Sequence, residues 1–362
     1  MVNNYPPSQG GVQIHVANLA ESLVRLGNTC IVVTLGNQKQ EQTVNGVTVI
    51  SIPGFLNIGS VFSFPRWGTI GFLKKLIQKE RIDCVSVHTR FFPLTWLGIR
   101  AADNTNTLSI ITEHGSDFVR GVSTPIKIAS RAVDWTLGRW ALRTARKRLA
   151  ISGASQKFVK QISGKESSVF FNAIQTALWV PTVFSAKQSL VFIGRLVPDK
   201  GWRESVYVFN SLAEDNPGLT LDIFGSGPET LAARELVEAS PHKDRIELYG
   251  SQPATVIKEK LSGAVLLNPT RLAEGFQTTL LEAFASGTRI VTYKTPGISE
   301  LLSSGAMIWE SRDLDQLVEH SMIALKAKPA VPSKESLKRW DWVTRAHQFQ
   351  EIAKKELSST FN

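Results

Sequence analysis

The sequence predicts an α/β protein with two doubly wound, Rossmann-like domains, each built on a parallel sheet. Apolar strand patterns alternate with helical patterns through most of the chain, stop at an irregular stretch over residues 172–188, and then restart. A chain of 362 residues is too long for one ordinary core and suits two. Because ligands of such sheets bind beyond the carboxyl ends of the strands, we expect a site in a central cleft between the domains.

The elements follow in order along the chain. The first half has strand patterns at residues 29–34, 47–52, 82–88, 107–112, 148–152 and 168–171. Helical periodicity covers residues 13–27, which end on a glycine suited to a helix terminus, and residues 69–80. The second half has strand patterns at residues 189–194, 219–225, 245–250, 264–269, 289–293 and 305–310. This βαβ alternation, found twice, predicts the two sheets.

The amino terminus departs from this pattern. The first helical pattern starts near Gly11, and residues 1–9 do not have the composition of a buried strand. A doubly wound domain normally begins with a strand, and loss of a central strand would expose its neighbours' edges and much of the core. We therefore expect that the first strand is missing and that the native chain begins upstream of Met1.

Composition narrows the class of protein. Hydrophobic residues make up 43% and charged residues 20%, as in soluble globular proteins, and no apolar run is long enough for a membrane span. The first residues lack the apolar core of a signal peptide. Cys30 and Cys84 lie in strand-like runs, which predicts two buried thiols in a reducing compartment, and no metal-ligand spacing of Cys and His is present. We expect a cytoplasmic protein, at most peripheral at the inner face of the plasma membrane.

The net charge of +10 predicts an anionic partner. Residues 120–148 hold eight basic residues and one acid, Asp134, together with two tryptophans. Basic and aromatic residues on one helix suit an anionic membrane surface, and the candidates are Lys127, Arg131, Trp135, Arg139, Trp140, Arg143 and Arg146. A helix packed by its Trp side, with a solvated basic face, fits equally well. Nucleic-acid binding is disfavoured, because no RNA- or DNA-binding motif accompanies the charge.

Two glycine-rich or basic loops could hold phosphate. Gly10 and Gly11 precede a helix, whose free N–H groups and dipole would face a phosphate or a sugar oxygen, although a plain turn fits the same pattern. Arg195 and Lys200 follow a strand and could clamp a diphosphate, although each alone could be a solvated loop charge. The "FGSGPE" stretch at 224–229 is typical of a turn between a strand and a helix.

The stretch "EGFQTTLLE" is the most informative. Glu274 precedes a helical pattern and Glu282 lies within it, and eight helical residues rise at most about 12 Å. The two carboxylates could therefore accept hydrogen bonds from the vicinal hydroxyls of two parts of one extended ligand. Between them, residues 275–278 (Gly275, Phe276, Gln277 and Thr278) place helix-start N–H groups toward a phosphate. Two exposed glutamates near a helix start are the other interpretation.

Taken in order with "PGISELL" at 296–302, these motifs resemble the family-4 retaining glycosyltransferases of the GT-B fold, also called group 1. The resemblance covers nearly the whole chain, and "GRLVPDKG" with the paired glutamates is its specific part. It implies two Rossmann-like domains that face a central cleft. Residues 1–175 would bind the acceptor, residues 185–335 the nucleotide-sugar, and residues 336–362 would form a helix that returns to the first domain.

The resemblance also implies roles for the residues that match. Gly10 and Gly11 would approach the donor's diphosphate and sugar, while Arg195 and Lys200 would neutralise the leaving nucleoside diphosphate. Glu274 would lie near the transferred sugar and Glu282 would bind the ribose hydroxyls. His114, which alone fits an ordinary loop histidine, would contact the donor sugar near the reacting carbon.

One residue departs from the family's motif. Gln277 stands where the family usually has glycine, and its side chain could contact the sugar or restrict the pocket.

The resemblance therefore implies a retaining hexosyltransferase that acts without a metal or another cofactor. It would move a sugar from a nucleotide-sugar to a glycan or lipid-linked acceptor, in cell-envelope or surface polysaccharide synthesis. Two alternatives stay open. One is a catalytically silent GT-B-fold binding protein at a membrane surface, and the other is a nucleotide-sugar epimerase of the same fold.

Overall fold

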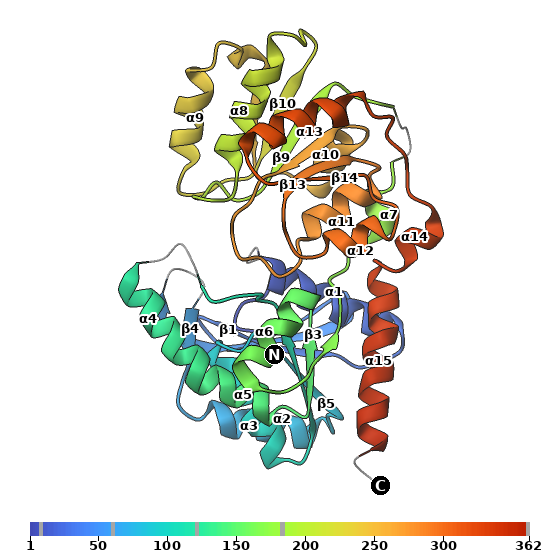
Figure 1. The fold of residues 1–362 in the computed structure, drawn as a ribbon. Helices are drawn as coiled ribbons and strands as arrows, with labels where there is room; N and C mark the ends of the chain where they lie inside the picture. The colour runs from blue at the N-terminus through green and yellow to red at the C-terminus, as the bar shows by residue number, and fades with distance from the viewer. Residues whose placement is uncertain (7–9, 59–61, 120–122, 182–184, 360–362) are drawn as a thin grey trace. The chain divides into compact units, whose positions relative to one another are not determined.

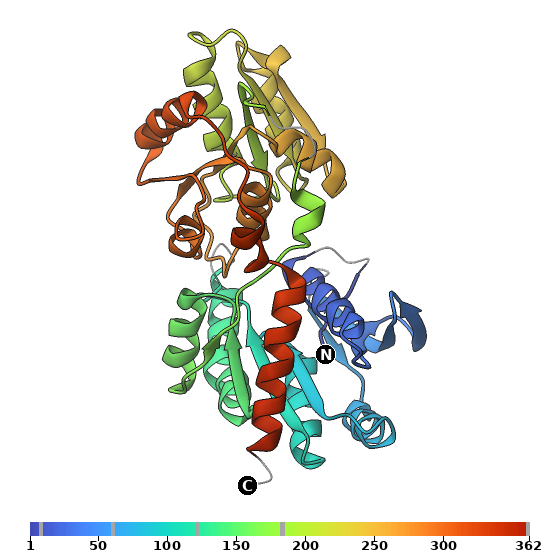
Figure 2. The same cartoon turned by 90° about the vertical axis from the view of Figure 1, so that its right-hand side faces the viewer.

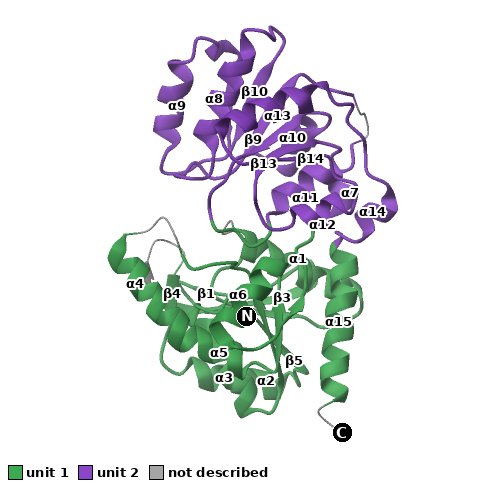
Figure 3. Cartoon of the chain, in the orientation of Figure 1, with its two compact units in different colours: residues 1–173, 273–276, 342–362 green, residues 174–272, 277–341 purple. Residues whose placement is uncertain are grey.

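The computed structural model describes residues 1–6, 10–58, 62–119, 123–181 and 185–359. The chain forms two compact units (Figure 3). Unit 1 comprises residues 1–173, 273–276 and 342–362, and unit 2 comprises residues 174–272 and 277–341. Three stretches with sequence predictions lie partly outside the described residues, namely residues 7–9 before the glycine pair, residues 120–122 of the basic segment, and residues 182–184 of the irregular stretch.

Unit 1 holds two small sheets (Figure 1). In the first, β1 (Ile31–Gly36) pairs in parallel with β3 (Val47–Ile58), which also pairs antiparallel with β2 (Gln40–Val44) and β4 (Phe62–Pro65). The second is parallel throughout, in the order β5 (Cys84–His88), β6 (Leu108–Glu113), β7 (Lys147–Ala150), β8 (Ser168–Val169). The carboxyl ends of β5 and β6 therefore share one edge.

The first residues of the chain connect these two sheets. The Val2 N–H donates to Val33 O (3.1 Å) on β1, and the Met1 amine donates to Ser86 O (2.6 Å) on β5. Asn3 O accepts from the Leu35 N–H (3.1 Å). This segment therefore lies where a central strand would lie, although it is too short and irregular to be assigned as one.

The expectation that residues 1–9 contain no buried strand-like segment is therefore wrong for the first residues. Val2, Asn3 and Tyr5 are all buried. The polar Asn3 is tolerated there because its amide is paired: Nδ2 donates to Ser63 O (3.0 Å) and Oδ1 accepts from the Leu94 N–H (3.3 Å).

Helices cover the sheets of unit 1. They are α1 (Gly11–Arg25), α2 (Thr69–Lys79), α3 (Pro93–Asn104), α4 (Thr124–Val133), the π-helical turn η1 (Asp134–Gly138), α5 (Arg139–Thr144), α6 (Gly153–Ser163) and α15 (Trp342–Ser358). The last helix runs along unit 1 in both views (Figures 1 and 2). Its Trp342 and Phe349 are buried with Leu19 of α1 and Phe170, so the final residues complete a core begun by the first helix.

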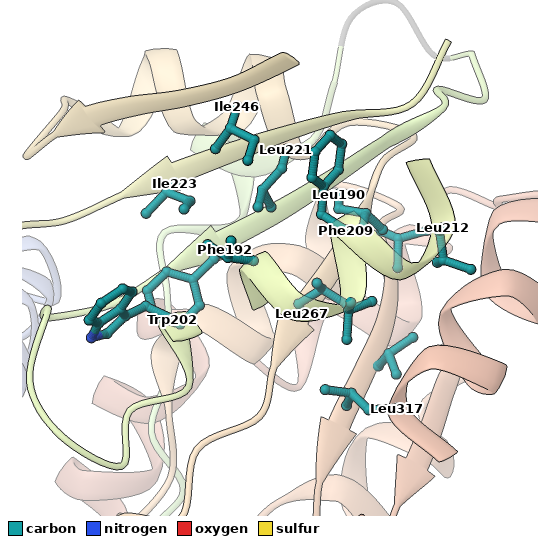
Figure 4. Packing of buried hydrophobic residues seen from close by; sticks show 14 of the residues in the cluster. Leu190, Phe192, Trp202, Phe209, Leu212, Leu221, Ile223, Ile246, Leu267 and Leu317 are labelled. Atoms are coloured by element: carbon teal, nitrogen blue, oxygen red, sulfur yellow. The ribbon is translucent and has the colours of Figure 1, made fainter. Parts of the chain in front are cut away.

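Unit 2 contains one six-stranded parallel sheet. Its order is β11 (Ile246–Gly250), β10 (Thr220–Phe224), β9 (Ser189–Ile193), β12 (Val265–Asn268), β13 (Arg289–Tyr293), β14 (Ile308–Ser311). Its helices are α7 (Thr176–Trp179), α8 (Trp202–Ala213), α9 (Thr230–Glu238), the 3-10 turn η2 (Lys243–Arg245), α10 (Ala254–Leu261), α11 (Thr278–Ala285), α12 (Ile298–Leu302), α13 (Leu314–Lys326) and α14 (Lys334–Lys338). Phe192, Trp202, Phe209 and Leu317 pack in its core (Figure 4).

The strand order of unit 2 reverses between β9 and β12. The chain builds outward from β9 through β10 to β11, then returns to β9's other side and builds outward through β13 to β14. The loop after β9 and the loop after β12 therefore lead away from each other, to opposite sides of the sheet. Doubly wound sheets bind ligands in the crevice between two such loops. Arg195 and Lys200 follow β9, and Glu282 follows β12 on α11.

The α/β fold class with two Rossmann-like parts is confirmed.

The prediction about the two cysteines holds only in part: Cys30 and Cys84 are free thiols, but both are partly exposed rather than fully buried. Burial raises the pKa of the Cys30 thiol to about 11 and that of the Cys84 thiol to about 12. Within the described residues, no helix combines the length and apolar character needed to span a bilayer.

Candidate functional site

The loop after β9 carries the two predicted phosphate ligands. Arg195 is exposed. Lys200 is buried, with only 9% of the residue exposed, and the methylene groups of its side chain pack against Gly194. The loop also packs on the segment that follows β12, since the Arg271 N–H donates to Asp199 O (2.8 Å). Gly201 lies so close to Pro269 that a Cβ there would meet it at 2.6 Å. Arg195 and Lys200 therefore follow β9, and the start of α11 follows β12, which is the neighbouring strand of the same sheet.

The "FGSGPE" turn supports this loop. Gly225 has φ +128°, and a Cβ on it would lie 1.9 Å from Gly194 O. The Leu196 N–H donates to Ser226 O (3.1 Å), on the next residue of the turn. Only glycine permits this backbone approach, so the turn holds the loop that carries Arg195.

Helix α11 places Glu282 and Gln277. Gln277 caps the helix, Thr278 begins it, and Glu282 follows one turn later with a hydrogen bond from Thr278. Burial raises the pKa of Glu282 to about 7, and the Thr278 hydrogen bond opposes that shift. Gln277 is 5% exposed, and neither end of its amide has a partner among the described residues. A buried amide with both ends unpaired is costly unless a ligand pairs with it.

In unit 1, His114 follows β6 in a loop held by a buried ion pair. The Glu113 carboxylate accepts from the Gly115 N–H (2.8 Å) and from both the Nη1 (2.9 Å) and the backbone N–H (3.0 Å) of Arg90. Arg90 Nε also lies 2.9 Å from Asp134 Oδ1 on η1. The residues on both sides of His114 are therefore fixed by backbone hydrogen bonds and buried charges.

Residues 273–276 fold with unit 1, which brings Glu274 to the His114 loop. The Ser116 hydroxyl donates to Glu274 O (2.5 Å), and Asn172 Nδ2 donates to Phe276 O (3.0 Å). A Cβ on Gly275 would lie 2.0 Å from His114 O. The structure therefore places the backbone of Glu274 beside His114, although 160 positions separate them in the sequence.

Two further histidines beside His114 were not predicted. His15 of α1 and His88 at the end of β5 join it, and one ring nitrogen from each of the three lies within 4.8 Å of the others. His88 Nδ1 is 3.2 Å from His114 Nε2. The available signal was positional: His88 and His114 end neighbouring parallel strands, and His15 lies one turn into the helix that opens with the glycine pair.

The glycine pair begins α1. Gly10 is the N-cap, in an extended conformation, and Gly11 is the first helical residue. Because a glycine cap has no side chain, it cannot itself accept the N–H groups of the first turn. The first turn also has no acidic residue. This helix start keeps the positive character that an anion or a sugar oxygen would meet.

The basic segment divides into an exposed part and a packed part. None of the residues of α4 is buried, and Ile126 and Ile128 are 54% and 66% exposed beside Lys127 and Arg131. In this part the Arg131 guanidinium lies over the Phe118 ring, 4.0 Å from its centroid.

The tryptophans of the segment behave differently. Trp135 is 42% exposed, with the Arg139 guanidinium 5.9 Å from its ring centroid, whereas Trp140 packs against the core of unit 1. Arg143 is exposed, and Arg146 donates to Asn106 Oδ1 (2.7 Å). Trp140 therefore faces the core, as the alternative of a helix packed by its tryptophan side expects, whereas Trp135 does not.

These features fit the GT-B fold of glycosyltransferases, and the comparison with solved structures identifies that fold. A solved glycosyltransferase from Rickettsia africae aligns with a TM-score of 0.73 at 15% identity, over 98% of this chain and 97% of that one. Anabaena HepE, solved with UDP and glucose, aligns with a TM-score of 0.72 at 16% identity, over 97% of this chain and 98% of that one.

The chain belongs to the family-4, group 1 glycosyltransferases. Residues 9–178 match the family described as Glycosyltransferase Family 4, and residues 177–341 match Glycosyl transferases group 1. A phosphatidylinositol N-acetylglucosaminyltransferase subunit of Arabidopsis thaliana is 24% identical over 96% of this chain and 78% of that protein. The 2-deoxystreptamine N-acetyl-D-glucosaminyltransferase of Niallia circulans is 25% identical over 82% of this chain and 83% of that protein.

Proposed function

We propose that this glycosyltransferase moves a sugar from a nucleotide-sugar to a glycan or lipid-linked acceptor, with retention at the anomeric carbon. The observation that carries the proposal lies within unit 2. The Arg195–Lys200 loop and the start of α11, with Glu282 one turn in, follow neighbouring strands at the point where the sheet order reverses. This combination of cations, helix N–H groups and a carboxylate suits the binding of a diphosphate and a ribose.

Different residues act on the leaving diphosphate, the ribose and the transferred sugar. The bond between the anomeric carbon and the phosphate oxygen breaks, and Arg195, Lys200 and the helix-start amides stabilise the charge on the leaving diphosphate. The acceptor oxygen attacks from the same face, and its proton passes to the leaving phosphate. Glu282 accepts hydrogen bonds from the ribose hydroxyls, while Glu274 and His114 contact the transferred sugar. With two cations at the diphosphate, the reaction needs no metal ion.

Two observations support N-acetylglucosamine as the transferred sugar. The relatives described above are named as N-acetylglucosaminyltransferases that act on different acceptors. Gln277 also has a carboxamide with an unpaired donor and an unpaired acceptor, which is the hydrogen-bonding complement of an acetamido group. We place the reaction in cell-envelope or surface polysaccharide synthesis, and a phosphatidylinositol-type relative favours a lipid-linked acceptor.

A membrane surface is part of the proposal. The exposed apolar and basic side chains of α4 suit the interface of an anionic bilayer, where a lipid-linked acceptor would be met. We therefore propose a cytoplasmic protein that associates with the inner face of the plasma membrane.

Binding and turnover of nucleotide-sugars test the proposal. We expect the full chain to bind one of UDP, GDP and ADP selectively, with UDP favoured, and Glu282→Ala to weaken that binding at least about tenfold. Glu235→Ala, which removes an exposed glutamate from α9 of the same unit, is the matched control and should bind normally. Sugar transfer from UDP-N-acetylglucosamine should give a product with the donor's anomeric configuration and should persist in EDTA.

Three results would contradict the proposal. A folded wild type that binds none of the three nucleotides would favour the silent binding protein. Release of an epimer or a free sugar without any acceptor would favour the epimerase. Loss of transfer in EDTA, restored by a divalent cation, would remove the metal-independent mechanism.

A further inference from the structure

Three large apolar side chains project into solvent from β3 and from the turn that follows β4 in unit 1. Phe55 is 45% exposed, Leu56 is 60% exposed, and Trp67 is fully exposed. Tryptophan is mostly buried in folded proteins, and neighbouring exposed apolar residues mark a surface that binds another molecule. These three residues, with the exposed Arg66 beside them, are called the Trp67 surface.

The backbone fixes the exposure of these side chains. The Arg66 N–H donates to Pro53 O (3.4 Å), and the Thr69 hydroxyl donates to Arg66 O (2.7 Å), so hydrogen bonds hold the turn that carries Trp67. Leu56 has φ +55°, which bulky side chains rarely adopt, at a point where the pairing of β3 with β4 is irregular. Such strain persists only where the surrounding structure imposes it. Leu56 and Trp67 therefore reach solvent from an ordered backbone.

A row of aromatic rings joins the Trp67 surface to the strand ends of unit 1. The ring centroids of Phe55 and Phe64 are 5.9 Å apart, and those of Phe64 and Phe62 are 5.2 Å apart. Phe62 in turn lies 6.2 Å from Phe92, which follows the last residue of β5, His88, by four positions. The row therefore leads from the Trp67 surface to the carboxyl end of β5.

The charge of this part of the chain indicates the kind of partner. Residues 42–79 contain no aspartate or glutamate, but they contain Arg66, Lys74, Lys75 and Lys79. Exposed apolar and aromatic side chains among basic residues suit the headgroup region of an anionic bilayer, where tryptophan and arginine are both favoured.

Helix α4 has the same character. It follows β6, the strand beside β5 in the sheet, and it combines the exposed Ile126 and Ile128 with Lys127 and Arg131. The chain enters α4 from the carboxyl end of β6, which shares an edge with the carboxyl end of β5. Two elements associated with one edge of unit 1 are thus apolar, basic and exposed.

We propose that the Trp67 surface inserts into the headgroup region of an anionic bilayer and is a second membrane-binding element of unit 1, besides α4. The inference rests on the proposed function for its acceptor, because a lipid-linked acceptor keeps its chain in the bilayer. Two separate contacts fix the orientation of unit 1 on a membrane, whereas one helix leaves it free to turn about that helix. The strand ends that carry His88 and His114 then face the bilayer, and the acceptor headgroup receives the sugar without leaving the membrane.

Cosedimentation of the full chain with vesicles of phosphatidylglycerol and phosphatidylcholine tests the surface. We expect Leu56→Asn with Trp67→Gln to weaken binding at least about tenfold, because two apolar side chains no longer leave water. Asparagine tolerates positive φ, so this variant should stay folded. The control is Leu231→Asn with Tyr207→Gln, which removes a leucine that is 68% exposed and an aromatic residue that is 49% exposed from unit 2. It should bind as the wild type does.

Arg66→Glu tests the electrostatic part of the surface. Each basic residue near an anionic membrane contributes about fivefold in affinity at moderate ionic strength, so this variant should bind at least about fivefold more weakly. On vesicles of phosphatidylcholine alone, the effect of Arg66→Glu should disappear, because these lipids have no net charge.

Quenching of tryptophan fluorescence supplies a second readout. Trp67→Phe keeps an aromatic ring on the surface but removes the fluorophore, so it should still bind vesicles. Vesicles with brominated acyl chains quench tryptophans that reach the bilayer, and the quenched intensity should be lower in Trp67→Phe than in the wild type. Trp309→Phe, on β14 of unit 2, is the control and should leave the quenched intensity unchanged.

Four results would overturn the inference. Wild-type protein that does not bind the anionic vesicles would do so, as would unchanged affinity in a folded Leu56→Asn, Trp67→Gln variant. Equal quenched intensity in the wild type and Trp67→Phe would place Trp67 outside the bilayer. A dimer in solution that this double variant abolishes would mean that the surface binds a second copy of the chain. By contrast, vesicle binding through the Trp67 surface in a protein that transfers no sugar would contradict only the proposed function.

Discussion

Arg90 and Glu113 form an ion pair inside unit 1, with Arg90 Nη1 2.9 Å from Glu113 Oε1 and both side chains no more than 1% exposed. Asp134 adds a second buried carboxylate, 2.9 Å from Arg90 Nε. The pair therefore ties the residue before His114 to the π-helical turn. The stability of this buried cluster depends on Arg90, Glu113 and Asp134 together, because none of the three charges is hydrated.

We expect Arg90→Met to destabilise the protein by about 3–5 kcal/mol, because it leaves two buried carboxylates without their cation. Thermal unfolding monitored by circular dichroism measures the change. Arg100→Met, at an exposed position of α3, is the control and should stay within about 0.5 kcal/mol. Adding Glu113→Gln to Arg90→Met should recover part of the loss, and a further loss would show that the pair is not the source.

The second prediction concerns Gly275. A Cβ there would lie 2.0 Å from His114 O and 2.7 Å from Ile151 Cδ1, so Gly275→Ala must move backbone beside Glu274 and His114. We expect sugar transfer to fall at least about tenfold, because small displacements of reacting groups are costly, while UDP binding stays normal. Gly153→Ala, where the Cβ meets open space at the start of α6, should leave both unchanged. Full activity in Gly275→Ala would remove this loop from the site.

The third prediction is a pH dependence of nucleotide binding. The pKa of Glu282 is about 7 in the free protein, and hydrogen bonds from ribose hydroxyls favour its charged form. Binding therefore releases a proton at low pH. Affinity for UDP-N-acetylglucosamine, whose diphosphate is esterified at both ends and has no group that titrates in this range, should fall about tenfold per pH unit well below pH 7 and level off above it. Calorimetry from pH 5.5 to 8.5 measures this, and Glu282→Gln should bind more weakly and show a flat profile. An equal slope in both proteins would assign the proton to another group.

The fourth prediction concerns Gly225. Alanine there is strained at φ +128°, and its Cβ would lie 1.9 Å from Gly194 O. We expect Gly225→Ala to destabilise unit 2 by at least about 2 kcal/mol and to weaken UDP binding, because the displaced strand end carries the Arg195 loop. Gly218→Ala, with nothing near its Cβ, is the control. Denaturant unfolding and UDP titration provide the two readouts, and a stable variant with weak binding would point to direct ligand contact at the turn.

The last prediction is membrane binding by α4. Each basic residue near an anionic surface contributes about 1 kcal/mol, so Lys127→Glu with Arg131→Glu should weaken binding to phosphatidylglycerol vesicles at least about tenfold. Ile126→Asn with Ile128→Asn should weaken it through lost apolar insertion. Arg234→Glu with Arg312→Glu makes the same charge change at exposed positions of unit 2. Equal losses in both charge-reversal variants of a sedimentation assay would exclude a specific surface on α4.

The fold was predictable wherever one local pattern decides the structure. Each of the six strand patterns of the second half corresponds to a strand of unit 2, although β14 begins three residues later than expected, at Ile308. The burial of Asn3 was not predictable in this way, because it depends on Ser63 and Leu94, which lie far along the chain. A local sequence pattern predicts a strand or a helix. The hydrogen-bond partners of a buried polar residue depend on the tertiary structure, so a local pattern does not predict them.

The candidate site divides in the same manner. Arg195, Lys200 and Glu282 stand at strand ends or a helix start, so their positions follow from the βαβ pattern. The positions of His15 and His88 beside His114 could not be derived from spacing, because 72 intervening positions separate them and neither makes a local motif with His114. Their meeting requires the order of β5 and β6 in the sheet and the packing of α1, which only the fold determines.

The route of the chain has a consequence for synthesis on the ribosome. Unit 1 receives residues 273–276 and the whole of α15, and its core includes Trp342 and Phe349. Its first 173 residues therefore emerge long before the helix that covers Leu19 and Phe170. Until translation ends, that apolar surface is exposed to chaperones or to other nascent chains. A stop codon before α15 should thus produce an aggregating fragment, even though most of both units has been made.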